Sequence, residues 1–423
     1  MSTGLVLRGL READLDQTAA LLASRGDESD AVDLRLVVAD GDAGFDCVAV
    51  VVDGDRVVST AALLDETLHL GGVAIPAGQV ELVATDPEYE GRGLVRDLMA
   101  WAHRRSRDRG HLAQVMIGIP YFYRQFGYSY AIPMHRWRRL ATEPAAHPPV
   151  ADGVTVRRAT AAHPPAVHGV TVRRATTADI PAMHALQEAT RGDGAQLRMP
   201  HSAACWRWLV ARDGTHQLVA SRGGATVGTA RLVPPPEAAV LGELAASDPD
   251  AALALVAHGR AAAGGERLVV QERPGTVAGD AVEPLLAPPS EVDPKRDWYY
   301  ARIEDFAALL RHVEPLLVSR LAAAGLADRG HELLISSFRS HVRLTIGPSG
   351  ITSLTAGGPE QAPGAKGGCG VPPDALPGLV FGPYGALGLE QRLPDCYLGG
   401  RRELMAALFP PVRADLLTFY LPA

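Results

Sequence analysis

The sequence is poor in the residues that mark metal centres, disulfide frameworks and membrane spans. Its four cysteines, Cys47, Cys205, Cys369 and Cys396, are too far apart to form a CxxC pair or a metal-ligand spacing. We therefore expect four reduced, mostly buried thiols and no metal site. No segment approaches about 18 uninterrupted apolar residues, and the N-terminus lacks a basic stretch followed by an apolar run. These absences predict a cytoplasmic protein that does not contact a membrane.

Positive charge is also scarce. The chain has 41 Lys and Arg against 48 Asp and Glu, and the resulting net charge of −7 is spread along the sequence. Because nucleic-acid-binding domains carry a basic patch, we expect no nucleic acid partner, whereas a mildly acidic surface suits cationic small substrates. Hydrolase motifs are missing too: "GHELL" lacks the second histidine of a zinc-protease helix, and no GxSxG elbow occurs.

The chain has 423 residues, of which 47% are hydrophobic. This length and composition are sufficient for two or three soluble globular domains. A short repeat separates them: "AAHPPVADGVTVRRAT" at 145–160 is followed at once by "AAHPPAVHGVTVRRAT" at 161–176. Two copies of so short a unit cannot stack a core of their own. The repeat predicts a duplicated proline-rich linker over residues 145–168, with one spare strand start.

A second repeat indicates two copies of one domain. "LVLRGLREADLDQTAALL" and "VTVRRATTADIPAMHALQ" each have an apolar strand ending in arginine (Arg8, Arg173), an Asp six residues later (Asp14, Asp179) and then helical periodicity. The first copy continues with a meander, including a hairpin at "VDGDRV", then a strand, a loop, a helix and a strand, which is typical of a mixed α/β sheet. We expect these domains over residues 1–144 and 169–296.

The pattern changes near residue 297. A long helix is predicted over 303–325, followed by alternating strands around "HELLISSFRSHVRLTIGPSGITSLTAGG", a helix over 401–409 and a final apolar strand, "DLLTFYLPA". Residues 297–423 therefore read as an α+β domain.

One stretch of the first domain carries chemistry. "VELVATDPEYEGRGLVRDLMAWAHRR", residues 80–105, reads as a strand, a loop with two glycines and an amphipathic helix. A helix N-terminus exposes unsatisfied N–H groups, and glycines let the backbone approach an anion. We predict a pyrophosphate site made by Gly91, Arg92, Gly93, Leu94, Val95 and Arg96. A simple tight turn is the alternative, since a strand-GxG-helix pattern alone is a weak signal.

Together with "YFYRQFGYSYA" at 121–131, this stretch resembles the GNAT superfamily of acyl-CoA-dependent N-acyltransferases. The whole chain resembles the Eis family of aminoglycoside and lysine acetyltransferases, in which an active GNAT domain, a degenerate GNAT domain and a sterol-carrier-protein-like domain follow one another. "RGLVRDLMAWAHRR" and "YRQFGY" are the most specific matches. The resemblance implies two tandem GNAT folds before an α+β domain, acetyl-CoA or another acyl-CoA as co-substrate, an amine acceptor and a homo-oligomer, with a hexamer expected.

The resemblance also implies residue roles. Val83 and Thr85 would hydrogen-bond the pantetheine arm through their backbone, and Tyr123 would be the general acid that protonates the departing CoA thiolate. In the family the C-terminal carboxylate takes the proton from the amine, a role that would fall to Ala423, although the family usually ends in an aromatic residue. Glu81, on the motif strand, is the other candidate base, and its alternative is a solvated strand residue.

Glu90 departs from the family signature (Gln/Arg)xxGx(Gly/Ala), in which its position is cationic or an amide, and Val95 replaces the final small residue. A carboxylate near a pyrophosphate costs on the order of 1 kcal/mol when solvated. Either Glu90 faces solvent and pairs with a neighbour such as Arg92, or the site has drifted away from acetyl-CoA.

The sequence thus predicts an N-acetyltransferase that moves an acetyl or small acyl group to a primary amine by direct attack in a ternary complex. Expected acceptors are polyamines, aminoglycoside-like antibiotics or lysine-like amines. The alternatives are a non-catalytic GNAT-fold binding protein and a GNAT-fold enzyme with an altered donor or altered chemistry in natural-product metabolism.

Overall fold

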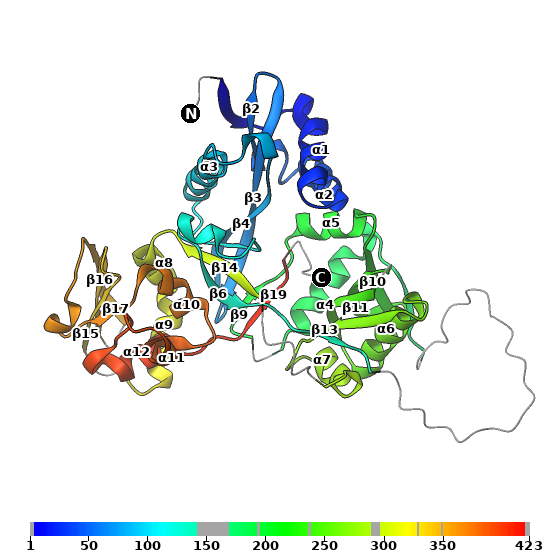
Figure 1. Ribbon diagram of the computed structural model, residues 1–423. Coiled ribbons are helices and arrows are strands. Elements are labelled where there is room, and N and C mark those ends of the chain that lie inside the picture. The colour runs from blue at the N-terminus through cyan, green and yellow to red at the C-terminus, as the bar shows by residue number, and fades with distance from the viewer. Residues whose placement is uncertain are drawn as a thin grey trace, which may run out of the picture. The chain divides into compact units, whose positions relative to one another are not determined.

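The computed structural model describes residues 4–141, 169–192, 195–235, 238–288, 297–327, 330–347 and 350–418. The duplicated segment at 145–168 and Ala423 therefore lie outside the described residues. The chain divides into two compact units (Figure 1), one of residues 1–134, 194–204 and 297–418, the other of residues 135–193, 205–296 and 419–423. No helix of the described ranges is both long and apolar enough to cross a membrane.

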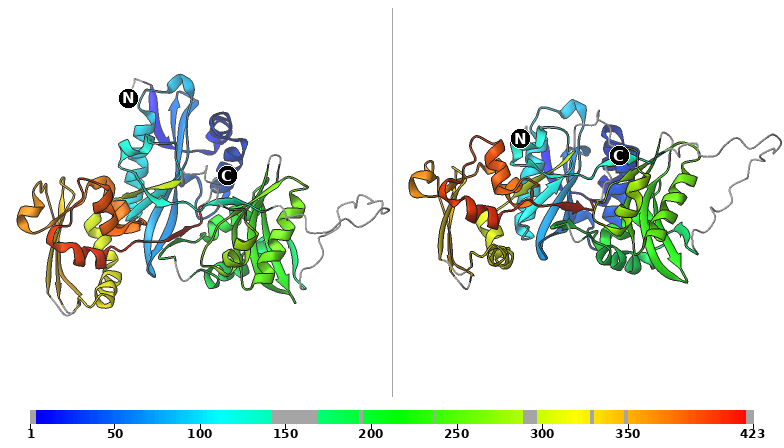
Figure 2. Two further views of the ribbon diagram at one scale, coloured as in Figure 1. Left: turned by 60° about the horizontal axis from the view of Figure 1, so that its bottom comes forward. Right: turned by 90° about the horizontal axis from the view of Figure 1, so that it is seen from below.

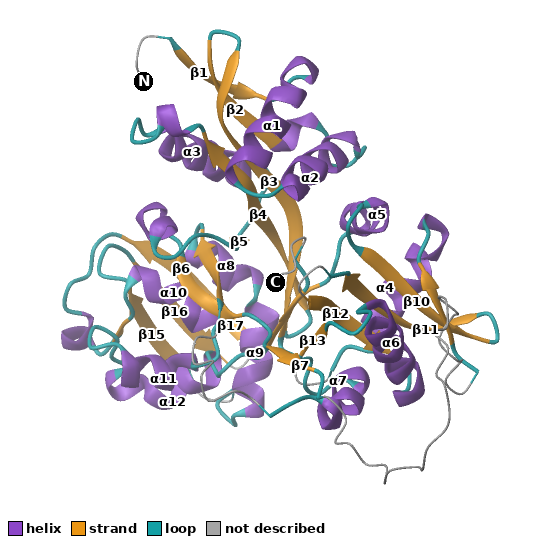
Figure 3. Ribbon diagram, turned by 45° about the vertical axis from the view of Figure 1, so that its right-hand side comes forward, coloured by secondary structure: helices purple, strands orange, loops and turns teal. Residues whose placement is uncertain are grey.

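The first unit is built on a mixed sheet with the order β1-β2-β3-β4-β5-β14-β6, which β9 and β19 extend beside β3. Its strands are β1 (Leu5–Gly9), β2 (Val48–Asp53), β3 (Arg56–Leu70), β4 (Val73–Thr85), β5 (Ala113–Met116), β6 (Ser129–Pro133), β9 (Leu197–Met199), β14 (Trp298–Ile303) and β19 (Ala414–Leu416). Helix α3 (Leu94–Asp108) lies on one face, and α1 (Leu15–Arg25) and α2 (Glu28–Ala39) lie on the other (Figures 1 and 3).

Local sequence explains the meander of this sheet. The run "VAVVV" of β2 is buried throughout, and the predicted hairpin to β3 forms around Gly54, whose φ is +59°. A φ of this sign is strained for residues with a side chain, and turns of this kind favour Asx-Gly pairs. Asp53 and Arg56 then pair directly across the turn.

The strands β4 and β5 pair over only part of their length, and this leaves an opening in the sheet. Their parallel pairing covers only Ala77–Gln79 against Ala113–Val115, while β4 continues to Thr85. Leu82, with φ of +53°, marks a register shift against β3. Such a bulge bends the strand and increases its twist, so an opening forms between β4 and β5.

The second unit contains a sheet of the order β7-β13-β12-β11-β10-β8. Its elements are β7 (Trp137–Arg139), β8 (Thr171–Arg174), α4 (Ile180–Ala189), α5 (Ala203–Ala211, starting in the first unit), β10 (His216–Arg222), β11 (Ala225–Val233), β12 (Ala238–Ala246), α6 (Pro249–Ala262), β13 (Arg267–Gln271) and α7 (Val277–Val282).

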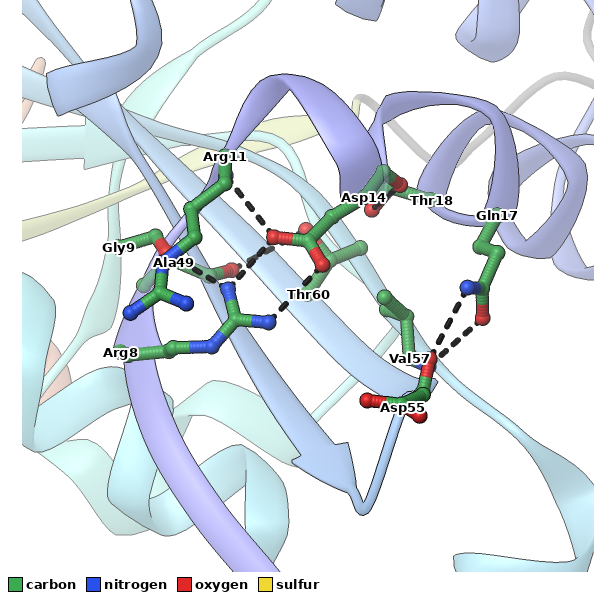
Figure 4. A network of polar contacts seen from close by, with 10 residues as sticks. All are labelled: Arg8, Gly9, Arg11, Asp14, Gln17, Thr18, Ala49, Asp55, Val57 and Thr60. Atoms are coloured by element: carbon green, nitrogen blue, oxygen red, sulfur yellow. Dashed lines mark hydrogen bonds and ion pairs between the residues drawn. The ribbon is translucent and has the colours of Figure 1, made fainter.

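The internal repeat has a physical basis in an arginine–aspartate pair. Arg8 donates to Asp14 through both terminal nitrogens, and Asp14 also accepts from the backbone N–H of Arg11, which starts the helical segment (Figure 4). Arg173 makes the same two bonds to Asp179 in the second unit, at 2.8 and 2.7 Å. Bidentate pairs of this kind fix orientation as well as charge, so each domain uses one device to join its first strand to its first helix.

Two strands pair with a sheet other than that of the domain in which the sequence places them. β7, expected in the first domain, pairs with β13 of the second sheet, and β14, expected in the C-terminal domain, lies between β5 and β6 of the first sheet. Buried backbone groups must be hydrogen-bonded, and β14 supplies those bonds to both neighbours. Composition does not reveal this exchange, because the pairing partners are far apart in sequence.

The C-terminal part of the first unit is an α+β fold on a sheet of order β17-β16-β15-β18 with flanking helices (yellow to red in Figure 2). Its elements are α8 (Phe306–His312), α9 (Glu314–Ala323), β15 (His331–Ser336), β16 (His341–Gly347), β17 (Gly350–Gly357), β18 (Cys369–Gly370), α10 (Leu376–Phe381), α11 (Gly385–Arg392) and α12 (Arg402–Leu408). The single helix predicted over 303–325 is wrong: it breaks into α8 and α9 at Val313, since Pro315 cannot donate a helical hydrogen bond.

Candidate active site

A cavity of about 560 Å³ opens beside the end of β4, where β4 and β5 have separated. Its walls come from the end of β4, the following loop, the start of α3 and the segment after β5. The predicted residues that line it are Val83, Thr85, Gly91, Gly93, Leu94, Val95, Arg96 and Tyr123. The structure thus brings the expected anion-binding loop and the expected general acid to one cavity, although about 30 residues separate them in sequence.

The loop has the backbone geometry that an anion site requires. Gly91 and Gly93 have φ of +73° and +84°, a region that residues with a side chain rarely adopt. Gly93 caps α3 without a side-chain hydrogen bond. The first N–H groups of a helix have no intrahelical acceptor, so those of Leu94, Val95 and Arg96 are available to an anion.

The two arginines of the loop differ. Arg96 lines the cavity, whereas Arg92 donates to the carbonyl of Glu88 at 2.9 Å and lies 4.4 Å from the centre of the Tyr89 ring. Arg92 does not line the cavity with its neighbours. Of the two side chains expected to reach phosphate oxygens, the structure therefore places only that of Arg96 on the wall.

Glu90 does have a basic partner, but it is Arg25 at the end of α1 rather than Arg92. An Arg25 nitrogen lies 2.5 Å from a Glu90 oxygen, and both side chains are partly exposed. Arg25 and Glu90 both line the cavity. The carboxylate thus holds a guanidinium beside the glycine loop, and Arg25 offsets the charge that Glu90 brings to it.

Removing Arg25 tests this compensation. We expect Arg25→Ala to weaken CoA binding by roughly threefold to tenfold, because an unneutralised carboxylate then faces the bound phosphates, and Arg25→Ala/Glu90→Gln to recover most of the loss. Calorimetric titration of CoA measures both. The difference between the two variants should shrink at high salt, and equal affinities for the wild type and the single variant at low salt would contradict the compensation.

Tyr123 is held in a packed aromatic environment. It belongs to a short 3-10 helix (Phe122–Phe126), and its ring makes edge contacts with Phe122 and Tyr300 at centroid distances of 5.1 and 5.8 Å. Burial, and then the charge of Glu81, raises the pKa of Tyr123 to about 12. The phenol therefore keeps its proton at neutral pH, which is the form that a general acid needs.

Glu81 is not the solvated strand residue that was its alternative interpretation. Its side chain is 6% exposed and accepts a hydrogen bond from the Gln79 amide. Burial raises its pKa to about 8, and the charges of Asp30, Asp33 and Glu66 add to the shift against the opposing bond from Gln79. Glu81 is thus mostly protonated at neutral pH, and it does not line the cavity with Val83 and Thr85 of the same strand.

Sequence reasoning missed Glu66 and Arg25. In "LLDETLHL" on β3 every second side chain is buried, including those of Leu64, Leu68 and Leu70. Glu66 occupies a position of the same alternation, so the two-residue period of a strand could have predicted its burial. Arg25 had no local signal, because its partner lies 65 positions away.

Glu66 makes stability depend on pH. Burial, and then the charge of Asp65, raises its pKa from 4.5 to about 8. A carboxyl that binds its proton more tightly when folded contributes its full stability below pH 4.5 and loses it as the pH rises towards 8. We expect the urea midpoint to fall between pH 5 and pH 8 and Glu66→Gln to flatten this fall. The exposed Glu332→Gln is the control, and an unchanged slope in Glu66→Gln would refute the assignment.

The corresponding helix of the second unit is closed to an anion. α6 begins at Pro249, and the side chain of Asp248 accepts from the Ala251 N–H at 3.0 Å. Asp248 is also paired with Arg222. In α6 the Asp248 carboxylate thus occupies the helix N-terminus, whereas the corresponding N–H groups of α3 have no such side-chain partner.

Comparisons with known proteins agree with this geometry. Residues 7–131 match the family model described as an acetyltransferase (GNAT) domain, so the first domain is a GNAT acetyltransferase domain, as its motifs predict. No curated protein matches the sequence.

Several solved structures share the fold over almost the whole chain. A GCN5-related N-acetyltransferase from Kribbella flavida is 19% identical with a TM-score of 0.60, over 98% of this chain and 100% of that one. One from Anabaena variabilis is 14% identical, with a TM-score of 0.64 over 97% and 99%. Eis1 from Mycobacterium abscessus is 16% identical, with a TM-score of 0.58 over 97% and 99%. At these identities the similarity establishes the fold, and it confirms the predicted class of two mixed sheets with helices and an α+β domain.

Proposed function

We propose that this protein is an acyl-CoA-dependent N-acyltransferase that transfers an acetyl or small acyl group to a primary amine. The observation that carries the proposal is that one cavity is lined both by a glycine loop at an open helix N-terminus and by Tyr123, a tyrosine that keeps its phenol proton at neutral pH. This pairing suits a thioester donor, because the loop can hold the phosphates and the tyrosine can supply a proton to the departing thiolate.

The residues divide the work of the reaction. The N–H groups of Leu94, Val95 and Arg96 hold the pyrophosphate, and the β4 backbone near Val83 and Thr85 lies along the same wall and orients the pantetheine arm. The neutral amine attacks the thioester carbonyl directly, and Tyr123 gives its proton to the departing sulfur. The proton of the amine passes to a base, for which we propose Glu81 or the carboxylate of Ala423.

The acidic charge balance of the chain supports a cationic acceptor. The net charge is −7 and is spread along the sequence. A mildly acidic surface favours polyamines, aminoglycosides or lysine-like amines over neutral substrates. We also propose a homo-oligomer, with a hexamer as the assembly to be tested by sedimentation.

Thiol release tests the activity. Acetyl-CoA is mixed with the protein and spermidine, lysine or kanamycin, and free CoA thiol and product mass are followed. We expect amine-dependent thiol release and a product heavier by one acetyl group. CoA binding without release from any amine would favour a binding protein, whereas no binding at all would remove the acyl-CoA proposal itself.

A further inference from the structure

A second cavity, of about 320 Å³, lies in the first unit between β6 and the helices α10 and α11. Its basic and aromatic lining residues are Arg124, Tyr130, Trp298, Tyr384 and Arg392, and none of its lining residues lines the first cavity. We propose that this cavity binds a flat aromatic molecule of one or two rings that carries a single carboxylate. The proposal does not depend on the acyltransferase reaction.

Three aromatic side chains form the walls. The rings of Trp298 and Tyr384 lie 6.0 Å apart with 37° between their planes. Tyr130 is 40% exposed and stacks on Tyr300 at 4.2 Å, so the ring has packed support while remaining accessible. Aromatic residues make up only 5% of the chain, and their concentration around one cavity favours a ligand with a π-face.

Two guanidinium groups supply the charge that selects an anion. Arg392 lies 3.9 Å from the centre of the Tyr384 ring and donates to the carbonyl of Gly388 at 3.2 Å. Arg124 is only loosely paired, at 3.9 Å from Asp374. A guanidinium has five N–H donors, so both arginines retain donors for a ligand.

The charge balance and the volume limit the ligand further. Asp374 and Asp395 also line the cavity, so a molecule with several negative charges, such as a diphosphate, meets carboxylates as well as guanidiniums. One carboxylate can instead pair with a single arginine. The volume of about 320 Å³ is at the small end for ligand sites, which suits one or two rings rather than a long chain.

Titration of naphthalene-2-carboxylate into the full chain tests the proposal, with naphthalene-2-methanol as the uncharged control. We expect the carboxylate to bind and the alcohol to bind at least about tenfold more weakly, because the alcohol cannot form the charge-assisted bond. Saturating CoA should leave binding of the carboxylate unchanged, since the two cavities share no lining residue.

Two variants locate the site. Arg392→Gln should weaken binding of the carboxylate at least about fivefold, and Arg343→Gln, at an exposed strand position outside the cavity, should not change it. The proposal is overturned if no binding occurs, if acid and alcohol bind equally, if Arg392→Gln binds as the wild type does, or if CoA displaces the probe.

Discussion

Replacing Tyr123 by phenylalanine should lower the turnover number by about 100- to 10,000-fold, the range typical of a lost general acid. The phenol is the only group removed, and the ring contacts with Phe122 and Tyr300 that hold the side chain are retained. Stability and CoA affinity should therefore stay close to those of the wild type. Steady-state kinetics with acetyl-CoA and the best amine measure the loss.

Tyr121→Phe is the matched control. Tyr121 is two positions away and 72% exposed, and it does not line the cavity. Removing its hydroxyl should leave turnover within about twofold of the wild-type value, as surface changes usually do. If Tyr123→Phe kept full turnover, another group would have to protonate the thiolate, and the role assigned to Tyr123 would be lost.

Replacing Gly118 by alanine should lower turnover by roughly 100-fold, since a shift of about 1 Å in a catalytic group can cost that much. A Cβ at Gly118 would lie 2.4 Å from a ring carbon of Tyr123, closer than real contacts allow. The ring cannot bend as a flexible chain end does, so Tyr123 has to move. The effect arises from space rather than backbone strain, because Gly118 has no positive φ.

A double variant shows whether Gly118 acts through Tyr123. Adding Gly118→Ala to Tyr123→Phe should cost much less than it does in the wild type, because the acid that it displaces is already gone. Gly41→Ala is the control, since a Cβ there meets no described atom within 4 Å. Fully additive losses would show instead that Gly118→Ala damages the cavity by another route.

The sequence was informative wherever the signal was local. The glycine loop, the helix after it and the pairing of Arg8 with Asp14 all depend on residues a few positions apart, and dihedral preference and helix periodicity decide such features. The same local reasoning applies to the second domain, where "SDPDAALAL" has Asp-Pro but no glycine at the start of the helix, and Asp248 caps α6.

It was uninformative where distant segments meet. The insertion of β14 between β5 and β6 and the burial of Glu81 depend on which surfaces cover which strand. The partner of Glu90 depends on where α1 ends in space. Residue types near Glu81 are compatible with either a solvated or a buried carboxyl, so no local pattern distinguishes the two.

By itself, the sequence determined the order of the domains, the open helix N-terminus of α3 and the presence of a tyrosine after β5, because backbone dihedrals and side-chain periodicity act over a few residues. Only the tertiary structure decided that loop and tyrosine share one cavity, that Glu81 has a raised pKa and that Arg25 neutralises Glu90. These properties arise from desolvation and Coulomb interaction, which depend on distance and solvent exposure in three dimensions rather than on separation along the chain.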